Sequence, residues 1–148
     1  MSAFPSQDTG RHAHFAFPVV PRYAEIDQQG VVFNAHYLTW FDEAFTGFLD
    51  HLGVAYPDLV AAGVDVQVVH TELDYAAPVR WRDEVAVGVT CERVGTTSFV
   101  LRFEVATTRS GATSVAVTGR TVYVCVDPTT WTKRDVPELL ASALGRSA

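Results

Sequence analysis

The strongest hydrophobic pattern in the chain has a helical period. Apolar side chains recur every three or four residues from Leu38 to Leu52, and Gly53 follows as a C-terminal stop. Asn34, a favoured N-cap residue, precedes this run, so the pattern predicts a helix of about four to five turns. Three further residues widen its apolar surface beyond a single stripe: Tyr37, Trp40 and Ala44. Most of the helix should therefore be covered, as it would be by a sheet wrapped around it.

Four later segments have the alternation and composition of β-strands, with turn residues between them. They cover residues 66–77, 84–93, 98–108 and 114–126. A fifth segment precedes the helix, at residues 15–26, and contains Pro18 and Pro21. Because proline cannot donate to a strand ladder, this segment should be an edge strand, or be bulged or irregular in its first half.

Two short helices complete the predicted elements. One lies near residues 57–62, and the other opens at Asp135 and continues through Leu144, with Gly145 closing it. One strand, one long buried helix and four consecutive antiparallel strands predict an α+β fold. In this fold a curved antiparallel sheet of about five strands wraps around one long central helix.

The composition is that of a single domain. The chain has 148 residues, of which 48% are hydrophobic and 19% charged, enough for one substantial core and too few for two ordinary domains. Residues 1–14 are polar and aperiodic, so we expect a flexible tail followed by one domain at residues 15–148. Because no long apolar run or signal-peptide pattern occurs, we expect a cytoplasmic protein without a membrane partner.

Charge and cysteine content argue against two further classes of site. A formal net charge of −6 disfavours nucleic-acid binding, which needs many cations to neutralise phosphates. Cys91 and Cys125 fall in apolar strand segments without metal-ligand spacing, so we expect buried free thiols and no metal site.

The most informative chemistry lies just before the long helix. The stretch from Arg22 to Tyr37 reads RYAEIDQQGVVFNAHY, and it places an acid, Asp27, close to Gly30 and to the predicted helix start at Asn34. The first amides of a helix lack partners inside the helix and carry partial positive charge. Either Asp27 simply stabilises this end of the helix, as acids commonly do, or the acid and the amides form an active site.

This stretch and several later features resemble the hotdog-fold thioesterases of the 4-hydroxybenzoyl-CoA thioesterase type. The first motif is Asp27-x-x-Gly-Val-Val-Phe-Asn-x-x-Tyr37. The later features are the helix, the Asp74-Tyr75-x-x-Pro78 turn, the Ser98-Phe99 strand start and the Val126-Asp127-Pro128 ending. The resemblance covers about residues 15–140. It implies the hotdog fold and hydrolysis of an acyl-CoA, or an acyl-carrier-protein, thioester to a free acid and a thiol.

The resemblance assigns the catalytic carboxylate to Asp27, either as a nucleophile that forms an acyl anhydride or as a base that deprotonates water. The backbone N–H of Asn34 would stabilise the oxyanion, and Gly30 would let the backbone turn tightly near the substrate. The expected substrate-binding residues of this stretch are Val31, Phe33, His36 and Tyr37. Glu25, two residues before Asp27, should share its strand face or pair with an arginine.

Binding of CoA needs cations for its phosphates. Relatives can place cations in the turn before the Ser98 strand, but here that turn reads Gly-Thr-Thr. Arg93 and Arg102 are therefore the predicted phosphate-binding residues, since arginine grips phosphate with two hydrogen bonds. Further cations of interest are Arg120, Lys133 and Arg134. The aromatic residues that line either an acyl pocket or the ordinary core are Phe33, Trp40, Phe41 and Phe45.

Two other functions remain open for a domain of this kind. A hotdog dehydratase or hydratase is disfavoured by the lack of a His-Phe-x-x-x-Pro motif, whereas a non-catalytic acyl-CoA-binding protein is a closer rival. His70 could contact the site or an interface. Thioester hydrolysis requires no metal or cofactor, and the resemblance implies a homodimer or a dimer-of-dimers tetramer with sites at the subunit interface.

Overall fold

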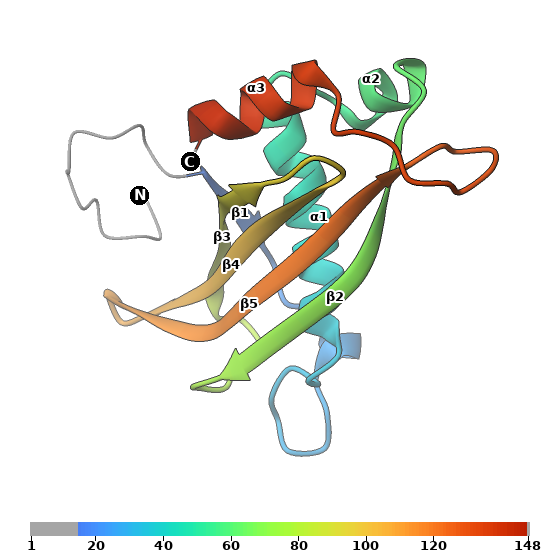
Figure 1. The fold of residues 1–148 in the computed structure, drawn as a ribbon. Coiled ribbons are helices and arrows are strands. Elements are labelled where there is room, and N and C mark those ends of the chain that lie inside the picture. Colours follow the sequence, from blue (N-terminus) through green and yellow to red (C-terminus); the bar gives the residue numbers. More distant parts are fainter. Residues whose placement is uncertain (1–14, 148) are drawn as a thin grey trace.

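Five antiparallel strands form one sheet in the computed structural model, which describes residues 15–147; the predicted tail at residues 1–14 lies outside this range. The strands are β1 (Phe15–Val19), β2 (Asp65–Tyr75), β3 (Glu84–Val94), β4 (Ser98–Arg109) and β5 (Ala112–Val126). Their order is β1-β3-β4-β5-β2, so β1 and β2 are the two edges of the sheet (Figure 1). The predicted α+β fold and the edge position of the first strand are confirmed.

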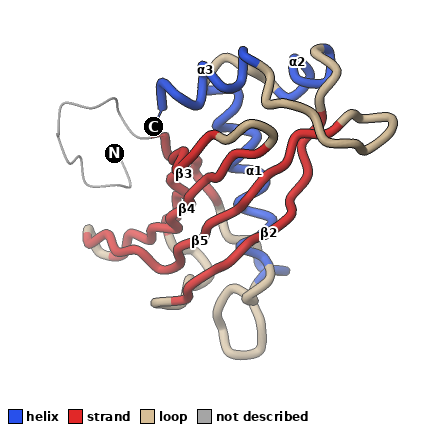
Figure 2. Tube along the Cα trace, viewed as in Figure 1, coloured by secondary structure: helices blue, strands red, loops and turns tan. Residues whose placement is uncertain are grey.

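The helices lie on one face and at one end of this sheet (Figures 1 and 2). Helix α1 (His36–His51) packs along the face, while α2 (Tyr56–Ala61) and α3 (Glu138–Ser147) are both near one end, and a short 3-10 helix, η1 (Tyr23–Glu25), follows β1. Within residues 15–147, no helix is both long and apolar enough to span a membrane.

Aromatic rings fill the space between α1 and the sheet. Phe41 stacks on Phe103 of β4 with ring centroids 4.5 Å apart, and Phe45 stacks on Tyr123 of β5 at 4.6 Å. All the side chains of α1 that were predicted to widen its apolar surface are buried. The alternating faces predicted for β3 and β4 are buried against the same helix. The sheet therefore covers the aromatic side of α1, where seven of its 16 residues are buried. The prediction that most of the helix is covered was wrong, because the opposite side faces outward and includes Leu38, which is 42% exposed.

The long helix begins later than the sequence predicted. Its N-cap is Ala35 and not Asn34, and no side chain in the described part of the chain caps this end. The reason is a turn just before the helix, which closes when the N–H of His36 donates to the carbonyl oxygen of Phe33 at 3.0 Å. Asn34 therefore lies inside this turn, one residue before the N-cap.

Two other predicted boundaries were wrong. The regular part of the first strand is its first half, because an edge strand tolerates Pro18; irregular chain and η1 occupy the second half, after Pro21. Helix α3 continues beyond Gly145 to Ser147. Glycine lowers helix stability but does not end a helix by itself, and the following residues keep the helical conformation.

The β2 edge and the two cysteines complete the description of the sheet. Among residues 15–147, strand β2 pairs only with β5. Its register shifts between Val68 and His70, and Val68 and Val69 are more than half exposed. Cys91 and Cys125 are buried and free, which confirms their prediction. Burial raises the pKa of Cys125 to about 11, so this thiol is an inert core residue.

Candidate active site

Residues 25–33 form a tight hairpin between η1 and α1. Ile26 and Val32 make an antiparallel bridge, and the N–H of Asp27 donates to the carbonyl oxygen of Val31 at 2.8 Å. The N–H of Gly30 donates back to the carbonyl oxygen of Asp27 at 2.9 Å. The loop that carries Asp27 lies at the opposite end of the molecule from α3 (Figure 1).

The carboxylate of Asp27 is half-buried and has one oxygen engaged. Its Oδ1 accepts the backbone N–H of Gln29 at 2.8 Å, which is the hydrogen bond of an Asx turn. Within residues 15–147, the structure records no hydrogen-bond or ion-pair partner for Oδ2. The side chain is thus oriented by one oxygen and keeps the other available for chemistry.

The turn that precedes α1 offers backbone donors. Among the described residues, neither Asn34 nor Ala35 donates its N–H to a recorded acceptor, whereas the N–H of His36 is used within the turn. The carbonyl oxygen of Asn34 accepts the hydroxyl of Tyr75, from the end of β2, at 2.9 Å. This bond fixes the orientation of the peptide that follows Asn34, and therefore of the N–H of Ala35.

Gly30 allows the backbone of the hairpin to turn. Its φ is +78°, a conformation that side chains with a Cβ rarely adopt. A Cβ built at this position would meet no atom within 4 Å, so the requirement for glycine is conformational and not a matter of space.

The other predicted residues of this stretch divide between surface and core. Phe33 is 45% exposed and its ring lies 5.8 Å from the half-buried ring of His36, so both flank the hairpin from outside. Val31 is also half-buried, at the tip. Tyr37 is 2% exposed, and burial raises the pKa of its hydroxyl. Tyr37 therefore supports the site from the core.

The two predicted phosphate-binding arginines do not lie beside this hairpin in the same chain. The hairpin contacts the chain just before β3, because the N–H of Val32 donates to the carbonyl oxygen of Val79 at 2.8 Å. Arg93 is near the other end of β3. The separation of Glu84 and Arg93 along β3 is roughly 30 Å. Arg102, on β4, approaches Glu92 at 3.5 Å.

Sequence reasoning missed a group of cations that is nearer to the hairpin. Trp81 follows two residues after Val79, its ring meets the ring of Tyr23 with centroids 5.6 Å apart, and the guanidinium of Arg82 lies 4.3 Å above it. Arg22 and Arg80 are also exposed here. The signal that could have revealed this group is the Arg-Trp-Arg triplet at residues 80–82, an exposed pattern in a loop next to the motif.

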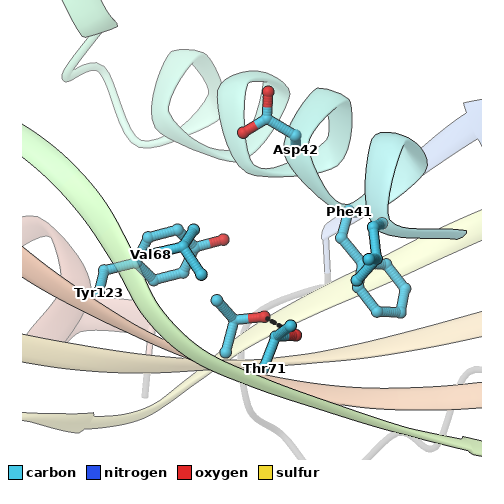
Figure 3. A pocket seen from close by; sticks show the side chains of 7 residues that line it. Phe41, Asp42, Val68, Thr71 and Tyr123 are labelled. Atoms are coloured by element: carbon cyan, nitrogen blue, oxygen red, sulfur yellow. Dashed lines mark hydrogen bonds between the residues drawn. The ribbon is translucent and has the colours of Figure 1, made fainter. Parts of the chain in front are cut away.

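A pocket of 140 Å³ opens between α1, β2 and β5 (Figure 3). Its lining residues are Leu38, Phe41, Asp42, Val68, Thr71, Thr121 and Tyr123. The hydroxyls of Thr71 and Thr121 are hydrogen-bonded at 2.9 Å, and burial raises the pKa of Tyr123. Of the predicted pocket aromatics, Phe41 lines this space, whereas Trp40 and Phe45 are buried core residues.

Glu25 has a different environment from the one expected. The predicted arginine is present, since Nε of Arg22 lies 3.6 Å from Oε1 of Glu25. The carboxylate is nevertheless buried, and its Oε2 accepts the indole N–H of Trp40 at 2.9 Å. No local spacing pointed to this contact, because the two residues are 15 positions apart.

Known proteins match both the sequence and the fold. A family model described as Thioesterase superfamily matches residues 29–122. The chain belongs to the thioesterase superfamily. This membership confirms the resemblance to hotdog thioesterases that the motif around Asp27 suggested, although the matched range begins two residues after that acid.

Relatives of this thioesterase cover most of the chain. YneP of Bacillus subtilis is 30% identical over 106 residues, which are 72% of this chain and 75% of YneP. The acyl-CoA thioester hydrolase YbgC of Escherichia coli O6:H1 is 27% identical over 128 residues, which are 86% of this chain and 93% of YbgC. A crystal structure of the hypothetical protein TT1821 from Thermus thermophilus superposes with a TM-score of 0.79 at 28% identity, covering 90% of this chain and 98% of that one.

Proposed function

We propose that this thioesterase hydrolyses acyl-CoA thioesters at the hairpin of residues 25–33. The observation that carries the proposal is the half-occupied carboxylate of Asp27, in a hairpin that leads directly into the two backbone amides without acceptors at Asn34 and Ala35. Thioester hydrolysis needs both parts, a group that activates or supplies the nucleophile and donors for the oxyanion. The name of the relative YbgC supports an acyl-CoA substrate.

Two mechanisms fit this arrangement. In the first, the free oxygen of Asp27 attacks the thioester carbonyl, the CoA thiolate leaves, and water then hydrolyses the acyl anhydride. In the second, Asp27 takes a proton from a water molecule that attacks the same carbonyl, the C–S bond breaks, and the CoA thiolate leaves and takes up that proton. In both, the amides of Asn34 and Ala35 stabilise the oxyanion, and one such donor typically contributes about 3 to 4 kcal/mol to transition-state stabilisation.

The pocket between α1 and β2 is the proposed position of the acyl group. It lies along α1 from the hairpin, since His36 and Asp42 are separated by about 9 Å of helix. Its volume of 140 Å³ suits an aromatic ring or a short chain, because a cavity of about 150 Å³ holds benzene. A Leu38→Trp exchange at the pocket should therefore lower turnover of aryl-CoA more than that of acetyl-CoA.

Assembly of two chains through β2 is part of the proposal. An unpaired edge strand with exposed Val68 and Val69 is a surface on which a second sheet can continue. A homodimer, or a tetramer of two such dimers, would place residues of a second chain beside the pocket. Arg93 and Arg102 do not lie beside the hairpin of their own chain, so in this proposal they bind CoA phosphates at the site of the other chain. Sedimentation that detects an active monomer at assay concentration rejects this part.

The first experiment measures thiol release from aryl, short, medium and long acyl-CoAs by the wild type and by Asp27→Asn. We expect turnover by the wild type and a loss of about a hundredfold or more in the folded variant, as for removal of a general base. Because the Asx turn of Asp27 also suits a purely structural role, binding of acyl-CoA without turnover by either protein would favour a non-catalytic acyl-CoA-binding protein. Turnover of acyl-carrier-protein thioesters alone would change the substrate class.

A further inference from the structure

Glu25 is the only buried acidic or basic residue among residues 15–146, with 4% of its surface exposed. Burial of a carboxylate is costly unless both oxygens are hydrogen-bonded. An apolar side chain of similar volume would fill the same space without this cost. Packing alone therefore does not account for an acid at this position.

Both oxygens of Glu25 have a donor. Oε2 accepts the indole N–H of Trp40 at 2.9 Å, and Oε1 accepts the backbone N–H of Arg22 at 2.8 Å. Trp40 is 2% exposed and belongs to α1. The side chain of Glu25 therefore joins the segment that enters the hairpin to the helix that leaves it.

The main chain of Glu25 holds the other side of the same hairpin. Its carbonyl oxygen accepts the N–H of Phe33 at 2.9 Å, and Ile26 pairs with Val32 directly beyond it. Asp27 follows two residues after Glu25, and Asn34 follows Phe33. A displacement of Glu25 relative to α1 would consequently move the Asp27 carboxylate relative to the turn that carries the proposed oxyanion donors.

We propose that Glu25 is a positioning residue, which acts through Trp40 to set the separation between the Asp27 carboxylate and the amides of Asn34 and Ala35. The inference rests on the proposed function, because it assumes that these groups carry the reaction. Reactions of this type are sensitive to geometry, and a misplacement of about 1 Å can lower the rate about a hundredfold.

Two variants break the hydrogen bond between Glu25 and Trp40, one from each side. Trp40→Phe removes the indole N–H and keeps an aromatic ring, whereas Glu25→Met removes both accepting oxygens and keeps a side chain of similar length. Each should lower kcat about tenfold and change KM by less than about twofold, since positioning affects the transition state more than binding. The double variant should be no slower than the slower single variant, because both changes break the same bond.

Phe48→Leu is the matched control. Phe48 is another buried aromatic residue of α1, 2% exposed, and its ring lies 5.6 Å from that of Phe15 at the opposite end of the helix. This variant should lose thermal stability and keep the kcat of the wild type when both are assayed well below their unfolding temperatures. If Trp40→Phe does not fold, benzothienylalanine at position 40 preserves the ring shape and removes only the N–H.

The outcomes separate this inference from the proposed function. If the folded Trp40 variants keep the wild-type kcat, or if kcat falls with stability in Phe48→Leu as well, Glu25 has only a structural role. If Asp27→Asn is inactive while the Glu25 and Trp40 variants are fully active, the positioning role alone is rejected. If Asp27→Asn remains active, the role of Asp27 in the proposed function is rejected, and with it the basis of the positioning role.

Discussion

Two aspartates of this chain sit in the same kind of turn but have different surroundings. Oδ1 of Asp27 accepts the N–H of Gln29 at 2.8 Å, and Oδ1 of Asp127 accepts the N–H of Thr129, also at 2.8 Å. Oδ2 of Asp127, however, accepts the guanidinium of Arg134 at 2.6 Å, whereas no partner of the second Asp27 oxygen is recorded within residues 15–147. The turn is the same at both residues and therefore does not identify a reactive acid. The second carboxylate oxygen, which lacks a recorded partner in Asp27, distinguishes the two.

The pKa of Asp127 shows what full engagement does to a carboxyl group. The N–H groups of Thr130 and Thr129, together with the guanidinium of Arg134, lower the pKa of Asp127 to about 2. This carboxylate therefore stays ionised down to a lower pH than an ordinary aspartate. Asp127 is suited to hold the loop before α3 in place, and it has no free oxygen for proton transfer.

The largest expected difference in activity is between two variants in which an aspartate, Asp27 or Asp127, is replaced by asparagine. Asp27→Asn should lower kcat/KM by about a hundredfold or more, while Asp127→Asn should keep it within about twofold. Steady-state thiol release at matched protein concentration measures both values. Equal losses in the two variants would mean that the reaction does not use Asp27 and that both residues only shape their turns.

Two glycines extend the comparison from side chain to backbone. Gly30 and Gly111 both have a φ of +78° and no atom within 4 Å of a built Cβ, but only Gly30 is in the hairpin. Replacement of either by alanine should cost about 1 to 2 kcal/mol of stability. Only Gly30→Ala should also lower kcat, by about tenfold or more, because it shifts the backbone between Asp27 and Val31.

Denaturant titration and thiol release measure the two quantities separately. A Gly30→Ala variant that loses stability but keeps full kcat would show that the catalytic groups tolerate a change of hairpin conformation. Gly111→Ala, in the turn between β4 and β5, controls for the backbone strain itself.

A smaller effect is expected at the hydroxyl that holds the turn before α1. Tyr75→Phe removes the hydrogen bond to the carbonyl oxygen of Asn34 and should lower kcat about threefold, with a stability loss of about 1 kcal/mol or less. Tyr56→Phe is the control, since this exposed hydroxyl donates to Asp65, far along β2 from Tyr75. A lower kcat for Tyr75→Phe than for Tyr56→Phe, at similar stability, would support the role of Tyr75. Equal kcat values would argue against it.

The smallest effect is a pH dependence at Asp127. Its pKa is lower in the folded chain than the usual value of about 3.9, so its interactions stabilise the fold fully above that pH. This contribution is lost as the pH falls toward about 2. The difference in stability between the wild type and Asp127→Asn should therefore shrink in denaturant titrations below pH 4, and a constant difference would contradict the assignment.

The elements of the fold were predictable because their signals are local. The period of the apolar residues from Leu38 to Leu52 indicates a helix, and the alternation in β3 and β4 indicates strands, without reference to any distant contact. The start of α1 was misplaced because a favoured N-cap residue, Asn34, is instead held in a turn whose carbonyl binds Tyr75, a residue 41 positions away. Capping preference is a weak signal when a tertiary contact competes with it.

The site was predictable only in part, for a similar reason. Asp27 and Gly30 were found because their spacing forms one short motif, whereas the contact of Glu25 with Trp40 depends on how α1 docks. The predicted arginines were chosen by residue type, and the sheet then placed Arg93 near the end of β3 remote from the hairpin. A correctly predicted strand therefore does not show which of its residues lie near the site, because its two ends are far apart.

The order of the strands also has a consequence for synthesis of the protein. The hairpin with Asp27 leaves the ribosome before β5, but Tyr75 reaches Asn34 on strand β2, whose only neighbour in the described part of the sheet, β5, ends at Val126. Pairings so distant in sequence form late because a long loop must close first. A nascent chain that stops before β5 therefore contains every residue from Asp27 to Tyr37 and lacks the strand that orders β2, so activity should emerge only after β5 has been synthesised.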